Sequence, residues 1–80
     1  MKTDFTDLMA AVKFKDDVNA WKGSDKLSKE ELIKLIEGEV EELKQAVENN
    51  ERKANQLLEI ADIVVFCGIL YNKIMKEERK

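Results

Sequence analysis

Residues 57–71, LLEIADIVVFCGILY, decide the fold because they are apolar almost throughout and yet contain two acids. Glu59 and Asp62 are spaced so that they lie one turn apart on the same side of a helix. A charge on a buried helix is costly unless it is paired or bound to a metal ion. The stretch therefore predicts a helix that other helices cover and whose two acids have a dedicated partner.

A second acidic pair, Glu39 and Glu42, repeats this spacing in the preceding segment. On a helical wheel Glu39 falls inside the apolar face of that segment, and Glu42 falls at its edge. Glu41 falls on the opposite side and is expected to be solvated. We therefore expect Glu39 and Glu42 to point toward the partner helices.

Signals at the ends of segments set the expected helix boundaries. Ser28 followed by Glu31 is a capping-box pattern, and it predicts the start of the second helix. This helix is expected to run to about Glu48, before the Asn49-Asn50 pair. The third helix is expected from about Lys53 to Met75, and the first from Thr3 or Asp4 to the turn at Gly23, Ser24 and Asp25.

The first helix has apolar residues on two roughly opposite faces, so it is either covered on both sides or bent near Lys13. One face carries Phe5, Leu8, Met9 and Val12, and the other carries Phe14, Val18 and Trp21.

The absence of proline and the presence of only three glycines favour long helices, and no strand pattern competes with them. The fold class predicted for residues 1–80 is a single all-α domain, with a three-helix protomer in which the second and third helices lie antiparallel. With 44% hydrophobic residues, such a protomer has more apolar surface than it can bury alone. We therefore expect a homodimer or a larger helical bundle.

Composition excludes several classes of protein. A net charge of −3 argues against a nucleic-acid-binding module, which would be basic. The apolar runs are shorter than the ~18 residues of a membrane span, and no signal-peptide pattern is present. One cysteine, Cys67, excludes an intrachain disulfide, and together with the absence of histidine it argues strongly against a zinc site. We expect a cytoplasmic protein in which Cys67 is a small buried side chain.

The four acids Glu39, Glu42, Glu59 and Asp62 suggest a metal site if their helices are neighbours. Carboxylates brought together repel one another, and a hard divalent cation relieves that repulsion. Oxygen ligands without histidine favour Mg²⁺, with Mn²⁺ as the alternative. Magnesium commonly joins protein carboxylates to substrate phosphates, which suggests chemistry on a phosphate or diphosphate. The competing interpretation is a set of buried acids that form salt bridges with lysine.

Two stretches, LIEGEVEELKQAV and LLEIADIVVFCGIL, resemble the MazG-like group of all-α nucleoside triphosphate pyrophosphatases, which also includes the all-α dUTPases. The family pattern is ExxE on one helix and ExxD on the next. Here these motifs are Glu39 to Glu42 and Glu59 to Asp62. The resemblance covers about residues 28–75, and the first helix matches only loosely.

The resemblance implies an α-helical bundle built from dimers or tetramers. It implies that Glu39, Glu42, Glu59 and Asp62 are catalytic residues that bind magnesium, and that one of them also orients the attacking water. The reaction implied is hydrolysis of a nucleoside triphosphate between its α- and β-phosphates, which gives a monophosphate and pyrophosphate. The usual cellular role is removal of non-canonical or surplus nucleotides.

The chain departs from the family pattern at several positions. Gly38 stands where an acid is common, and Ile69 and Asn72 stand where the family often has Asn and Arg. Lys73, next to Asn72, is an alternative contact for phosphates. The family also has a fourth helix, which a partner subunit would supply here. Trp21 either stacks on the nucleobase or packs in the core or at an interface.

Two other functions stay open at this point. One is a non-catalytic helical dimerisation protein whose acids are structural or vestigial. The other is a nucleotide sensor that binds without turnover. The sequence does not specify which base and sugar the nucleotide would carry, or whether the protein would form a dimer or a tetramer.

Overall fold

The computed structural model describes residues 2–78, except for the side chains of Trp21 and Glu78. Three α-helices follow one another along the chain: α1 (Thr6–Asn19), α2 (Lys29–Glu48) and α3 (Lys53–Glu78). Two single turns of 3₁₀-helix, η1 (Ala20–Lys22) and η2 (Ser24–Lys26), join α1 to α2. Residues 2–78 contain no strand, which confirms the all-α fold class.

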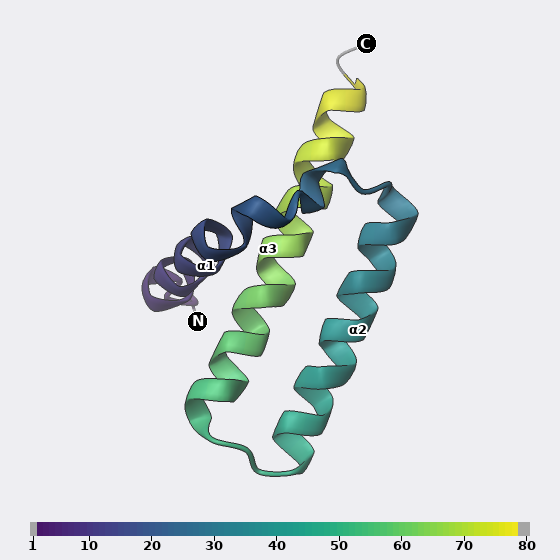
Figure 1. Ribbon diagram of the computed structural model, residues 1–80. Helices are drawn as coiled ribbons and strands as arrows, with labels where there is room; N and C mark the ends of the chain where they lie inside the picture. Colours follow the sequence, from purple (N-terminus) through teal and green to yellow (C-terminus); the bar gives the residue numbers. More distant parts are fainter. Residues whose placement is uncertain (1, 79–80) are drawn as a thin grey trace.

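The helices α2 and α3 lie antiparallel and side by side along most of their length (Figure 1). The predicted capping box starts α2: the Ser28 hydroxyl accepts from the Glu31 N–H at 3.1 Å, and the Glu31 carboxylate accepts from the Ser28 N–H at 3.0 Å. The helix ends at the predicted asparagines. Asn50 has a left-handed backbone (φ 56°), which asparagine adopts more readily than most residues, and it reverses the chain.

Helix α1 packs on α3, on the side away from α2, and crosses it obliquely (Figure 1). Its first helical residue is Thr6, later than predicted. The Asp4 carboxylate still supports this end, because it accepts a hydrogen bond from the Thr6 N–H at 2.9 Å. At the other end Gly23 takes a left-handed conformation (φ 69°) between the two 3₁₀ turns.

The two apolar faces of α1 have different surroundings. The helix runs through Lys13 without interruption, so the bend considered above does not occur. On the face that packs against α3, Leu8 and Val12 are half-buried, whereas Phe5 and Met9 stay exposed. Phe14 and Val18, on the other face, are exposed. Within the protomer α1 is therefore covered on one side only.

The hydrophobic core is small. Its buried side chains are Leu32, Ala46, Ala61 and Val65. Several large apolar residues on all three helices stay exposed, up to 65% for Tyr71. One protomer thus leaves much of its apolar surface uncovered, as expected, and the oligomer that would cover it stays a prediction.

The structure bears on the predicted burial of Cys67 and on the predicted absence of a membrane-spanning helix. Cys67 was expected to be buried and is exposed, because it lies on a side of α3 that neither α1 nor α2 covers. No helix within residues 2–78 is long and apolar enough to cross a membrane, in agreement with the sequence.

Candidate metal centre

Three of the four predicted acids meet between α2 and α3. Glu39 and Glu42 lie on α2 and Glu59 lies on α3; Glu39 and Glu59 are half-buried, whereas Glu42 is exposed. One carboxylate oxygen from each lies within 4.8 Å of the others. The meeting follows from the antiparallel pairing of the two helices, because their ExxE and ExxD motifs lie at the same level. We refer to Glu39, Glu42 and Glu59 as the glutamate cluster.

Asp62, the fourth predicted ligand, lies outside the glutamate cluster and pairs with a lysine. Its Oδ1 lies 3.3 Å from the Nζ of Lys15, which comes from α1. Both side chains are mostly buried, with 22% of Lys15 and 17% of Asp62 exposed. Asp62 is nevertheless close enough for its negative charge to raise the pKa of Glu39 and of Glu59.

Lys15 is the residue of this site that the sequence analysis did not identify. A signal for it was present, since Lys15 continues the inward face of α1 at the spacing Leu8, Val12, Lys15. A lysine in register with a half-buried apolar stripe needs a partner for its ammonium group. The partner could not be assigned without knowing how α1 crosses α3.

Two oxygens of the glutamate cluster are buried and lack a hydrogen-bond partner, namely Oε2 of Glu39 and Oε2 of Glu59. Desolvation by burial, followed by the negative charges of Glu42 and Asp62, raises the pKa of Glu39 to about 7. Desolvation is also the largest cause of the raised pKa of Glu59. The causes of both shifts include a hydrogen bond between Glu39 and Glu59, which requires a proton on one of them, so without a cation the cluster lowers its charge by holding a proton.

A divalent cation fits this donor set. Around Mg²⁺ opposite ligands are about 4.2 Å apart and adjacent ligands about 3.0 Å apart, so the three oxygens, which lie within 4.8 Å of one another, would have to move closer together to share one ion. The ligand atoms are all carboxylate oxygens, which suit Mg²⁺ or Mn²⁺. A shared ion would also offer a partner to the Oε2 atoms of Glu39 and Glu59, which accept no hydrogen bond from the described residues. The alternative of lysine-paired acids holds for Asp62 but not for these two oxygens.

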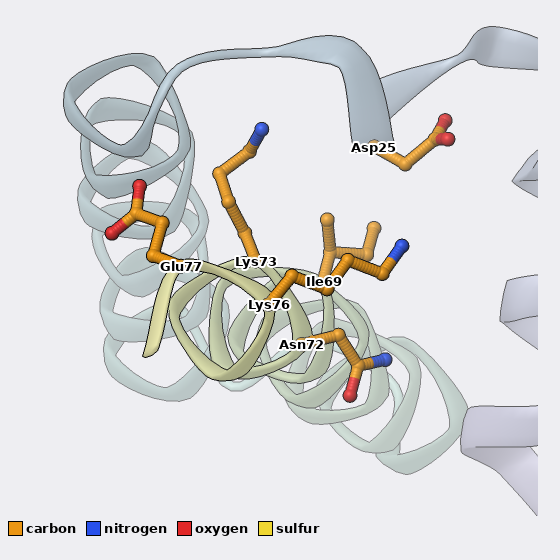
Figure 2. Close-up of a pocket in the computed structure, with 6 residues that line it drawn as sticks. All are labelled: Asp25, Ile69, Asn72, Lys73, Lys76 and Glu77. Atoms are coloured by element: carbon orange, nitrogen blue, oxygen red, sulfur yellow. The ribbon is translucent and has the colours of Figure 1, made fainter. Parts of the chain in front are cut away.

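The predicted substrate contacts Asn72 and Lys73 lie elsewhere on α3. They follow Asp62 by ten and eleven residues, which places them about 15 Å further along the helix axis. Both line a cavity of about 390 Å³ between the end of α3 and η2. Figure 2 shows Lys73 and Lys76 extending toward the side where Asp25 lies, while Asn72 points to another side of α3. The structure thus does not bring these two residues together with the glutamate cluster.

The third predicted substrate contact, Trp21, lies in η1, and its side chain is outside the described part of the structure.

Comparison of the chain with protein-family models, curated proteins and solved structures gives no match. The resemblance to the MazG-like group therefore rests on the two acidic motifs themselves.

The raised pKa of Glu39 predicts that stability without a cation falls as pH rises. The unfolded carboxyl ionises near pH 4.5 and the folded one near pH 7, so the folded state binds more protons between these values. Glu39→Gln removes this loss. Since Glu39 keeps part of its hydration, we expect the variant to be more stable than the wild type by about 1 kcal/mol at pH 8, and similar to it at pH 4.

Urea unfolding at the two pH values, with a chelator present, measures this difference. Glu37→Gln is the matched control, because Glu37 is exposed on the same helix. An equal gain at pH 4 and pH 8 would show that charge burial at Glu39 is not the cause. Added Mg²⁺ should stabilise the wild type more than the variant, because the variant lacks one of the carboxylates.

Proposed function

We propose that this chain is a Mg²⁺-dependent nucleoside triphosphate pyrophosphohydrolase of the MazG-like group. It would cleave a nucleoside or deoxynucleoside triphosphate into the monophosphate and pyrophosphate, and so remove unwanted nucleotides from the pool. The observation that carries this proposal is the glutamate cluster, whose buried oxygens on Glu39 and Glu59 lack partners. The ExxE and ExxD motifs that build it are those of the family.

The acids would act in two ways. Glu39, Glu42, Glu59 and Asp62 would hold the cation. When bound, Mg²⁺ supplies positive charge that neutralises the phosphates. That charge also lowers the pKa of Glu39, so its carboxylate is ionised at neutral pH. One of the four carboxylates is then available to orient the water that attacks the phosphate.

The assembly proposed with this function is a homodimer or homotetramer in the cytoplasm. The exposed apolar side chains on all three helices support a partner copy, as does the small core. The end of α3, with Lys73 and Asn72, is our proposed contact for the more distant part of the nucleotide. The aromatic ring of Trp21 is the proposed contact for the base.

The test is pyrophosphate release from a panel of canonical and modified nucleoside triphosphates, with and without Mg²⁺. Release that requires Mg²⁺ would support the enzyme and identify its substrate class. A folded protein that binds nucleotide but releases no pyrophosphate would be a sensor. A protein that does neither would be a helical interaction protein, for which the Lys15–Asp62 ion pair would be a purely structural contact.

A further inference from the structure

The ion pair between Lys15 and Asp62 places a positive charge at the edge of the glutamate cluster. The ammonium group lies 3.3 Å from Asp62 Oδ1, and both side chains are mostly shielded from water. Shielding strengthens the attraction within the pair, and it equally strengthens the repulsion between Lys15 and any other cation nearby. A positive charge in this position therefore affects what else can bind.

Lys15 neutralises only part of the local negative charge. In the part of the chain that the structure describes, this is the only ion pair that involves one of the four predicted acids. The buried oxygens of Glu39 and Glu59 are still without partners, and the pKa values of both residues are raised in part by Asp62. A divalent cation shared by the acids would supply the missing charge, but it would meet Lys15 at Asp62.

The same lysine contributes to the attachment of α1. No residue of α1 is buried, and its exposed residues include Phe14 and Val18. Of the ion pairs found among the described residues, the one between Lys15 and Asp62 connects α1 to α3. With so little apolar burial, the loss of this contact would weaken the docking of α1 on α3.

We propose that Lys15 is an internal counter-ion that competes with a divalent cation for Asp62, so that cation binding releases Lys15 and loosens the part of α1 around it. This inference rests on the cation that the proposed function requires. Asp62 alternates between two partners: the ammonium group of Lys15 in the cation-free protein, and the ion in the loaded protein. The affinity for the cation is thereby set partly by α1, which carries none of the four acids.

Lys15→Met tests the competition because it keeps the length of the side chain and removes its charge. We expect the variant to bind Mn²⁺ about three- to tenfold more tightly than the wild type, measured without nucleotide from the electron paramagnetic resonance signal of free Mn²⁺. Lys13→Met is the matched control, since Lys13 is exposed on the same helix, and it should bind like the wild type. Lys15→Arg, which keeps the charge, should also bind like the wild type.

Hydrogen exchange of the α1 amides provides a readout of the released state. Mn²⁺ should accelerate exchange around Lys15 in the wild type, whereas Lys15→Met should exchange fast with or without the ion. Far-UV circular dichroism verifies that each variant is folded, and Lys15→Gln replaces Lys15→Met if the latter is not.

The outcomes separate the two proposals. Equal Mn²⁺ affinity of Lys15→Met and the wild type, or an equal gain in Lys13→Met, would overturn the competition and leave the proposed enzyme intact. Slower exchange of α1 on adding Mn²⁺ would likewise overturn the release. Failure of both the wild type and Lys15→Met to bind Mn²⁺ at any concentration up to the millimolar range would overturn both proposals.

Discussion

Glu59→Gln is expected to reduce Mg²⁺-dependent pyrophosphate release by more than about a hundredfold while the helices persist. Glutamine keeps the shape of the side chain but removes its charge from the glutamate cluster. Changes to residues that only support metal ligands cost about 10- to 100-fold, so the loss of a ligand should cost more. A coupled assay for pyrophosphate, at saturating Mg²⁺ and with the best substrate of the panel, measures the effect.

The control for this prediction is Glu37→Gln, which removes the same charge from an exposed position on α2. Its turnover should equal that of the wild type. Glu59→Gln should also keep its helical content by circular dichroism, since neutralising a carboxylate with a raised pKa does not destabilise the fold. If Glu59→Gln turned over substrate as fast as the control, the glutamate cluster would not be the catalytic centre.

Leu32→Ala is expected to lower the free energy of unfolding by about 3 kcal/mol, the largest effect on stability that we expect from a single substitution in this chain. Among the side chains that the structure describes, Leu32 is the one large side chain that is completely buried. Removing its branched end leaves a cavity in a core that is otherwise built from alanine and valine. Domains of this size are stable by roughly 4–12 kcal/mol, so much of the total would be lost.

Urea unfolding followed by circular dichroism measures this change. Leu35→Ala is the matched control, because Leu35 lies on the same helix and is 38% exposed. It should cost about 1.5 kcal/mol, roughly half as much, because about 0.8 kcal/mol is lost per buried methylene and this side chain is only partly buried. Equal losses in the two variants would mean that the core is organised differently from the one described above.

The helices of this protein were predictable because their ends carry local signals. The Ser28–Glu31 capping box and the left-handed Asn50 act within a few residues of chain, so no knowledge of packing is needed to recognise them. The start of α1 lies about two residues later than predicted, and the burial of Cys67 was predicted wrongly. The exposure of Cys67 depends on which sides of α3 are covered by the other two helices. The sequence of α3 is apolar on nearly every side, so it does not indicate which sides these are.

The candidate site was also predictable only in part. The meeting of Glu39, Glu42 and Glu59 could be predicted, because helical spacing fixes each pair and a short loop fixes the pairing of α2 with α3. The partner of Asp62 could not. Lys15 lies on a separate helix, and its contact depends on the position and crossing angle of α1, for which the chain provides no local signal.

The small core has a thermal consequence. The heat capacity of unfolding arises mainly from apolar surface that becomes hydrated, and a protomer that already exposes Phe14, Tyr71 and Val47 has less such surface to gain. Its heat-capacity change should fall below the usual value of about 12–15 cal/mol/K per residue. The stability of a single protomer should then vary only gently with temperature, and its melting transition should be broad.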